Sequence, residues 1–225
     1  MKLGIVLPAA GTATRFGGDL GKLLWPVLGR SVLSWTLSAL DDYDWACSCR
    51  FVVATRDQDR DVVTQLVSET VRHSWEICLG GATREASVRA AVQALGDWPT
   101  HIMVHDAARP MVSAELIARL LVHPELPCVI PVIPCADTLK EVVGGYVQRT
   151  VPRDYLYRVQ TPQVFRAEVL HHIYANGEPS AVTDEAGLCE HFGIPVKTVL
   201  GDSCNIKLTF QDELPFLSMY LARKT

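Results

Sequence analysis

Short apolar runs that alternate with amphipathic segments are the feature that most restricts how this chain can fold. Five such runs occupy residues 3–7, 50–54, 75–79, 101–105 and 128–132. Continuous hydrophobicity over so few residues is typical of strands that are buried on both faces of a sheet. Between the runs, "SVLSWTLSALDDY" places Leu33, Leu37 and Leu40 on one helical face, and "DRDVVTQLVSETV" and "SVRAAVQAL" repeat that pattern.

This alternation predicts an α/β fold, in which helices cover both faces of a Rossmann-like, mostly parallel sheet. The length of 225 residues suits one domain, and the chain has no internal repeat or low-complexity linker. We therefore expect residues 1–225 to form a single domain. Sheets of this class bind ligands beyond the carboxyl ends of their strands, so the functional residues are expected in the loops after the apolar runs.

Composition argues against several classes of protein. The formal net charge is −4 and the isoelectric point is near 6.0, whereas a nucleic-acid-binding protein normally presents a basic face. No run of 18 apolar residues and no signal-peptide cleavage pattern is present, so we expect no membrane association and a cytoplasmic location. The seven cysteines form no C-x-x-C pair, and we expect reduced thiols.

The stretch "LPAAGTATRFGGDLGK", residues 7–22, follows the first apolar run and is rich in glycine and alanine. Small residues let backbone amides approach a phosphate closely, although a tight connection between two elements would also need them. The stretch matches neither G-x-x-x-x-G-K-[ST] nor G-x-G-x-x-G, which argues against a P-loop enzyme and a dehydrogenase. It predicts a phosphate-binding loop of another kind, with Arg15 and Lys22 as its cations.

Two further loops carry polar residues after apolar runs. "GGATREASV" supplies Arg84 and Ser87, and "HDAARP" supplies Asp106 and Arg109. A carboxylate at a strand end among cations suits a Mg²⁺ ion that itself binds phosphate oxygens. The alternative is that Asp106 caps a helix or a turn. We expect His105 to have a structural role.

Residues 134–157 interrupt the alternation of strands and helices. Alternating residues around "VVGGYV" predict a hairpin that turns at Gly144 and Gly145. A lone hairpin is marginally stable in water, so it needs a second surface to pack against. Its own domain could provide that surface.

Seven segments, taken in order, resemble one family. They are "LPAAGTATRFGG…GK", "GGATREASVRAAV", "VHDAARP", "DTLK", "TPQVF", "TDEAGLCEHFGIPV" and "GDSCNIKLT". In order and spacing they are similar to the 2-C-methyl-D-erythritol 4-phosphate cytidylyltransferases over nearly the whole chain. The resemblance implies that CTP and methylerythritol phosphate give CDP-methylerythritol and pyrophosphate, and that the hairpin at about 134–157 is an arm that pairs with its copy in a homodimer.

Three sets of site residues follow from the resemblance. The implied catalytic cations are Arg15, Lys22, Arg153 and Lys207. The implied nucleotide contacts are Pro8, Ala9, Ala10, Gly11, Gly81, Ala82, Arg84, Ser87 and Lys207. The implied contacts to the acceptor substrate are Asp106, Arg109, Thr138, Arg153 and Thr161, with Asp106 also binding Mg²⁺.

The chemistry of nucleotidyl transfer agrees with this inventory. A phosphate attacks the α-phosphorus in line, so cations must hold two anions together and stabilise extra charge in the transition state. A phosphate monoester is mostly ionised near neutral pH, so no histidine or cysteine is needed as a general base.

The chain departs from the family pattern at two places in the first loop. Ala13 stands where the family usually has a second glycine, and Gly21-Lys22-Leu23 stands where the family usually has Pro-Lys-Gln, so Lys22 is retained.

Two alternatives to this function remain open on the sequence. A related cytidylyltransferase could act on ribitol 5-phosphate or another polyol phosphate, because the same cations would bind its phosphate. A nucleotide-binding regulatory protein could keep the fold without turnover, and the altered "GKL" segment favours that interpretation. The retained cations Arg15, Lys22 and Lys207 argue against it.

Overall fold

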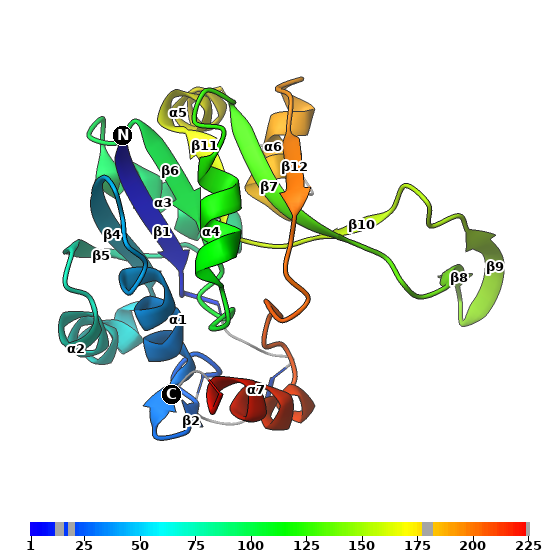
Figure 1. Cartoon of the computed structure of the whole chain (residues 1–225), viewed down its shortest axis with the longest axis horizontal. Helices are drawn as coiled ribbons and strands as arrows, with labels where there is room; N and C mark the ends of the chain where they lie inside the picture. Colours follow the sequence, from blue (N-terminus) through cyan, green and yellow to red (C-terminus); the bar gives the residue numbers. More distant parts are fainter. Residues whose placement is uncertain (12–15, 18–20, 177–181, 224–225) are drawn as a thin grey trace.

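The computed structural model describes residues 1–11, 16–17, 21–176 and 182–223. An eight-stranded sheet forms its centre, in the order β10-β7-β11-β6-β1-β4-β5 with β12 also paired to β7 (Figure 1). The strands are β1 (Lys2–Pro8), β4 (Ser48–Thr55), β5 (Ser74–Leu79), β6 (His101–Val104), β7 (Cys128–Pro134), β10 (Tyr157–Val159), β11 (Gln163–Arg166) and β12 (Lys197–Leu200).

The sheet is mixed but mostly parallel. Strand β1 pairs in parallel with β4 and β6, β4 with β5, and β12 with β7. Strand β11 runs antiparallel between β6 and β7, and β10 runs antiparallel along β7. The predicted α/β fold and all five predicted strands are confirmed. Strand β11, with the sequence QVFR, was not predicted, because only its two middle residues are apolar and no apolar run marks it.

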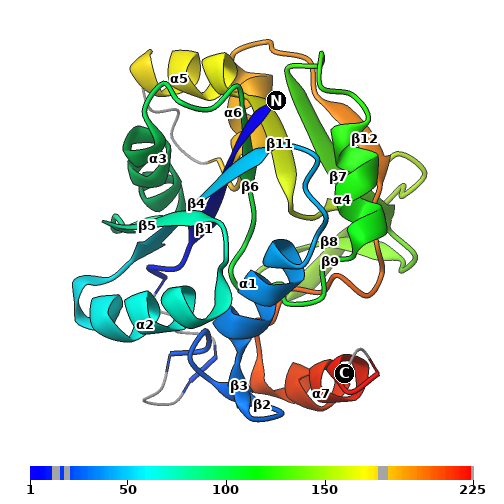
Figure 2. The ribbon, with the colours of Figure 1, turned by 60° about the vertical axis from the view of Figure 1, so that its left-hand side comes forward.

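Helices cover both faces of the sheet, as predicted (Figure 2). Helices α1 (Val32–Asp41), α2 (Arg60–Thr70) and α4 (Ala114–Leu121) share one buried cluster. Helices α3 (Arg84–Leu95), α5 (Ala167–Ala175) and α6 (Glu185–His191) share the other. No helix in the described part of the chain is long and apolar enough to cross a membrane.

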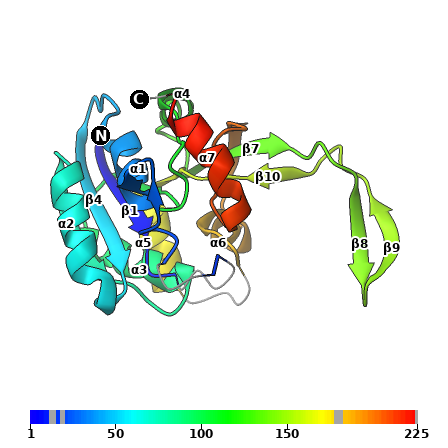
Figure 3. The same cartoon turned by 90° about the horizontal axis from the view of Figure 1, so that it is seen from below.

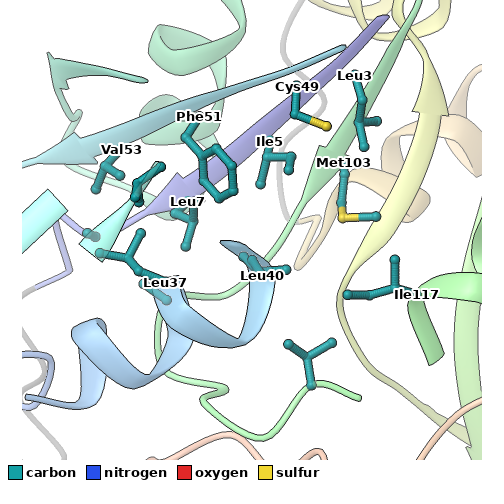
Figure 4. Close-up of a cluster of buried hydrophobic side chains, with 14 of the residues drawn as sticks. Leu3, Ile5, Leu7, Leu37, Leu40, Cys49, Phe51, Val53, Met103 and Ile117 are labelled. Carbon is teal, nitrogen blue, oxygen red and sulfur yellow. The ribbon is translucent and has the colours of Figure 1, made fainter. Parts of the chain in front are cut away.

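The buried side chains of β1 explain its continuous hydrophobicity. Leu3, Ile5 and Leu7 pack on one face of the sheet with Leu37 of α1 (Figure 4), while Val6 packs on the other face with α3. A strand with both faces covered needs apolar residues at every position. Each fully buried aliphatic side chain contributes about 1.5–3 kcal/mol relative to exposure.

A third cluster places the C-terminal segment beyond the carboxyl end of β1 (Figure 1). Leu217 of α7 (Leu214–Leu221) packs with Trp35 and with Val27 of the β2 (Pro26–Val27) and β3 (Arg30–Ser31) pair. The Leu208 N–H donates to the Ala108 carbonyl at 2.9 Å. The residues just before α7 are thereby held against the loop after β6. Two short 3₁₀ turns complete the described elements, at Asp57–Asp59 and Gln211–Glu213.

The predicted hairpin is present and extends away from the sheet (Figures 1 and 3). Strands β8 (Leu139–Val143) and β9 (Tyr146–Val151) pair with each other, and Gly144 and Gly145 turn between them with φ of +58° and +84°. Two positive φ values match a type I′ turn, which glycine adopts without strain. The alternative that this arm folds back on its own domain is wrong, since Val143 and Tyr146 are exposed.

Two valines on α2 provide a test of the core. Val67 is fully buried, whereas Val62 is 41% exposed. We expect Val67→Ala to lower the free energy of unfolding by about 2 kcal/mol, because it removes two packed methyl groups. Val62→Ala is the control and should change it by no more than about 0.5 kcal/mol. Urea unfolding followed by circular dichroism measures both, and equal losses would contradict this description of the core.

Candidate active site

A cleft of about 340 Å³ lies where the loops after β1, β5 and β6 meet the segment before α7. Its lining includes most of the predicted nucleotide contacts and two predicted catalytic cations: Pro8, Ala10, Gly11, Gly81, Ala82, Arg84, Ser87, Lys22 and Lys207. The carboxyl ends of parallel strands meet at one edge of the sheet, which brings these distant loops together. Their individual roles stay predictions.

Glycine and one serine shape the loop after β5. A β-carbon at Gly80 would overlap Cβ of Ala10, so this loop packs against the loop after β1 only without a side chain there. The Ser87 hydroxyl accepts a hydrogen bond from the Gly81 N–H at 3.1 Å and donates one to the Thr83 carbonyl at 2.9 Å. These hydrogen bonds hold the loop as one wall of the cleft.

Ala9 and Gly11 have different environments although both were predicted to contact phosphate. The Ala9 N–H donates to the Ala54 carbonyl at 2.7 Å and so continues the pairing of β1 with β4. The sheet therefore uses the single donor of this amide, and the predicted backbone contact of Ala9 with the nucleotide stays a prediction. A β-carbon at Gly11 would meet no atom of the described residues within 4 Å, so these residues leave space beside Gly11 for a ligand.

Asp106 is the centre of a cluster of charged groups. Its Oδ1 lies 3.0 Å from Nε of Arg84, and its Oδ2 lies 3.0 Å from Nζ of Lys207 and 3.3 Å from Nε of Arg109. Burial works to raise the pKa of Asp106, but Arg84, Lys207 and Arg109 outweigh burial and hold this pKa well below its usual range. The Asp106 carboxyl group is therefore ionised at physiological pH. Burial also lowers the pKa of Arg109, while Asp106 works to raise it.

A second cleft of about 590 Å³ shares its wall with the first. Arg84, Asp106 and Lys207 line both clefts, and the predicted substrate contacts Arg109 and Thr161 line the second. Two separate spaces therefore meet at one cluster of charges. This arrangement suits a reaction between two anionic ligands, because each can occupy its own cleft while the same cations reach both.

Thr161 and His105 form a chain of hydrogen bonds that begins at the backbone amide of Asp106. The Thr161 hydroxyl accepts a hydrogen bond from the Asp106 N–H at 2.9 Å and donates one to Nδ1 of His105 at 3.1 Å. Nε2 of His105 donates to the Arg109 carbonyl at 3.0 Å. Burial lowers the pKa of His105 to about 4, so its ring is neutral at pH 7. These contacts agree with the structural role expected for His105.

Three of the predicted site residues that the structure describes, Ala9, Thr138 and Arg153, do not line either cleft in the single chain. Arg15 lies outside the described residues. Thr138 is exposed between β7 and β8, and Arg153, next to the arm, donates a hydrogen bond to the Ala136 carbonyl. Thr138 and Arg153 can therefore reach a site of this kind only on another chain or after a movement of the arm.

The residues of the clefts do not form an independent Mg²⁺ site. No group of three or more histidine, cysteine or acidic residues that could hold a metal occurs in the described part of the chain. Asp106 is the one carboxylate among the described residues of the first cleft, and three cations already contact it. Mg²⁺ is commonly held by one or two carboxylates together with substrate phosphates. The site thus fits an ion that arrives with a nucleotide.

Comparison with known proteins assigns the family. The family model for 2-C-methyl-D-erythritol 4-phosphate cytidylyltransferase matches residues 3–223. The chain belongs to this family. A member from Frankia casuarinae is 41% identical over 225 residues, which cover 99% of this chain and 82% of the relative. A bifunctional IspD/IspF enzyme from Dinoroseobacter shibae is 37% identical over 92% of this chain, and the match covers 51% of the relative.

Solved structures of the cytidylyltransferase family have the same fold. The 4-diphosphocytidyl-2C-methyl-D-erythritol synthase of Anaerococcus prevotii matches with a TM-score of 0.82, at 29% identity and with 98% of both chains covered. The enzyme of Thermus thermophilus matches with a TM-score of 0.74, at 32% identity, over 99% of this chain and 100% of that one. The chain is therefore a nucleotidyltransferase of the cytidylyltransferase type.

Glu185, which the sequence did not predict, contacts the predicted site residue Arg84. Its two carboxylate oxygens lie 2.9 and 2.8 Å from Nη1 of Arg84, and its side chain is fully buried. Burial raises the pKa of Glu185, while Arg84 works to lower it. Burial likewise works to lower the pKa of Arg84, but Glu185 and Asp106 raise it. "TDEA" carried the resemblance, yet nothing in it shows a partner 101 residues away.

The neutral ring of His105 predicts a pH dependence of stability. Its pKa falls from 6.5 in the unfolded chain to about 4 in the native one, so the unfolded chain binds more protons between these values and stability falls as the pH falls. Between pH 7 and pH 5, the unfolding free energy of the unaltered chain should fall by on the order of 2 kcal/mol more than that of His105→Gln. Urea titrations without nucleotide measure this, with His171→Gln on α5 as the control. Parallel curves for the unaltered chain and His105→Gln would contradict the assignment.

Proposed function

We propose that this chain transfers CMP from CTP to 2-C-methyl-D-erythritol 4-phosphate, releases pyrophosphate and so forms CDP-methylerythritol for isoprenoid biosynthesis. The observation that carries the proposal is the Asp106 cluster, in which Arg84 and Lys207 line both clefts. One cleft takes CTP and the other takes the acceptor. In this proposal the whole chain acts as one nucleotidyltransferase domain with the arm as an appendage.

The nucleotide occupies the cleft bounded by the loops after β1 and β5. Open space at Gly11 leaves room for the triphosphate beside the backbone, and Lys22 lines the same cleft. Lys22 donates to the Leu208 carbonyl at 3.2 Å, which ties the first loop to the segment carrying Lys207. Lys22, Lys207 and Arg15 then stabilise the charge that develops on the α-phosphate and on the departing pyrophosphate.

The acceptor occupies the second cleft, where Arg109 and Thr161 lie. Its phosphate monoester is already ionised near neutral pH, so its oxygen attacks the α-phosphorus without a general base. The buried, neutral His105 fits this account, since its two nitrogens are both engaged by Thr161 and Arg109. The contribution of this site is to hold two anions at close range.

Mg²⁺ enters the proposal as part of the nucleotide complex. When bound, the ion neutralises charge on the phosphate oxygens. Asp106 is the residue that would hold the Mg²⁺ ion, once the nearby cations turn toward the phosphates.

Because the ion is needed to neutralise phosphate charge, activity should disappear in EDTA and return with added Mg²⁺.

The arm supports a proposal of a homodimer with shared sites. Val142, Val143, Tyr146 and Val147 expose 54, 62, 78 and 60% of their surface on β8 and β9, and a patch of this kind is typical of an interaction surface. In a symmetric pair, the arm of one chain would carry Arg153 and Thr138 to the second cleft of its partner.

The direct test of the proposed function is a pyrophosphate-release assay. The purified chain receives CTP and Mg²⁺ with methylerythritol phosphate, ribitol 5-phosphate or no acceptor. We expect release with methylerythritol phosphate alone. Faster release with ribitol 5-phosphate would assign the other substrate, and CTP binding without release from any acceptor would make the chain a nucleotide-binding regulatory protein.

Lys22 is expected to act on the transition state. Lys22→Ala should lower kcat by about 100-fold or more, with a smaller effect on the KM for CTP, because its ammonium group acts mainly on charge that develops during transfer. Lys197→Ala, a change at an exposed lysine on β12, is the matched control and should retain normal kcat. A near-normal kcat for Lys22→Ala would remove this residue from the catalytic set.

Arg153 is expected to act in the partner's site. The Lys22→Ala and Arg153→Ala homodimers should each be nearly inactive. Unfolded and refolded together in equal amounts, they should form about half heterodimers, each with one intact site, so about a quarter of the parent activity should return.

The control for this experiment mixes Lys22→Ala with Lys207→Ala. Both residues line the first cleft of their own chain, so no activity should return from that mixture. Native mass spectrometry must show heterodimers in each case. Heterodimers of Lys22→Ala and Arg153→Ala without recovered activity would overturn the shared site.

A further inference from the structure

Arg84 and Glu185 are the first residues of two helices whose N-termini meet at this ion pair. Arg84 begins α3 and Glu185 begins α6. Both oxygens of Glu185 bind the same nitrogen, Nη1 of Arg84, at 2.9 and 2.8 Å. Together with the contact of Nε to Asp106, this contact holds the guanidinium plane at two nitrogens.

The donors of Arg84 are not all engaged. Nε donates to Oδ1 of Asp106 at 3.0 Å, and Nη1 is held by Glu185. Nη2 is buried and has no hydrogen-bond partner within the described structure. A buried donor left without a partner is costly, and natural proteins rarely tolerate one without a reason. Because Arg84 lines both clefts, an oxygen of a bound substrate can reach the buried Nη2 after a small movement of the neighbouring side chains, and it is the fitting partner for this donor.

The placement of this pair is unfavourable for stability alone. The positive end of a helix dipole lies at its N-terminus, so Arg84 at the start of α3 is disfavoured there. Burying the Glu185 carboxylate carries a further desolvation cost, which well-packed apolar residues would avoid. The dipole of α6 favours Glu185 at its start, but the buried pair still carries this desolvation cost, and because Arg84 lines both clefts the pair is better explained by its effect on the site.

We propose that Glu185 is a positioning residue, which holds the Arg84 guanidinium so that Nη2 donates to a phosphate oxygen where the two clefts meet. The inference rests on the proposed function and extends it to a residue of α6. The acceptor oxygen belongs either to the nucleotide or to the phosphate of the second substrate. The separate KM values for CTP and for methylerythritol phosphate distinguish these two sources.

The first test replaces the charge of Glu185 and keeps its shape. Glu185→Gln should lower kcat/KM by about 10- to 100-fold, because Arg84 loses its bidentate partner. A rise in the KM for CTP assigns Nη2 to the nucleotide, and a rise in the KM for methylerythritol phosphate assigns it to the acceptor. Glu168→Gln, on the surface of α5 where Glu168 pairs with Arg166, is the matched control. Parent-like kcat/KM in Glu185→Gln would overturn the proposal.

The second test asks whether Glu185 acts through Arg84. If it does, Arg84→Met should already remove the effect, so Arg84→Met/Glu185→Gln should have the activity of Arg84→Met alone. Losses that multiply in the double variant would show that Glu185 acts by another route. A purely structural role would instead lower stability in each variant without this dependence.

Folding is monitored in every variant by thermal melting. Should Glu185→Gln be unfolded at the assay temperature, Arg84→Met/Glu185→Met removes both buried charges and is used instead. A folded double variant as active as Arg84→Met supports the proposal. An unfolded one would mean that the position serves the fold, and would overturn it.

A binding measurement separates this inference from the proposed function. Calorimetric titration of CTP needs no turnover, and its Kd should rise by about tenfold in Glu185→Gln if Nη2 binds the nucleotide. An unaltered chain that releases no pyrophosphate refutes the proposed function. An active unaltered chain with parent-like affinity and turnover in Glu185→Gln refutes the role of Glu185 alone.

Discussion

The buried carboxylate of Asp106 is the constraint on which the arrangement of this site depends. Three cations converge on it from three parts of the chain: Arg84 at the start of α3, Arg109 in the same loop, and Lys207 before α7. Without Asp106 these cations would repel one another at short range in a partly dry cleft. The carboxylate keeps them close, so an incoming phosphate finds positive charge already in place and little reorganisation is needed.

The sheet explains how residues so far apart in sequence reach one carboxylate. Strands β1 and β6 are parallel neighbours, so their following loops leave the same edge of the sheet. Helix α7 packs under β2 and β3 and brings Lys207 to that edge. The antiparallel strand β11 lies against β6, and the chain just before it presents Thr161 to the Asp106 amide at 2.9 Å. The hydrophobic clusters thus position the polar site.

The site is held firmly yet leaves several buried polar atoms without partners. Nη2 of Arg84, Oε1 of Gln163 and Oδ1 of Asn205 have no hydrogen-bond partner in the part of the chain that the structure describes. The other polar atoms of these side chains are engaged, with Gln163 donating to Asp184 and Asn205 to the Thr161 carbonyl. The free donor of Arg84 suits a phosphate oxygen, whereas the free amide oxygens of Gln163 and Asn205 can only accept a hydrogen bond.

The sequence by itself determined the five strands with continuous apolar runs, the helical faces, the loops at the carboxyl edge and the turn at Gly144 and Gly145, since these depend on local periodicity and on residues with special backbone freedom. Its motifs also determined the family. Only the tertiary structure decided that Ala9 donates to the sheet and that Glu185 binds Arg84. Such pairings join segments far apart in sequence, and their geometry follows from how the sheet and helices pack rather than from the residues on either side.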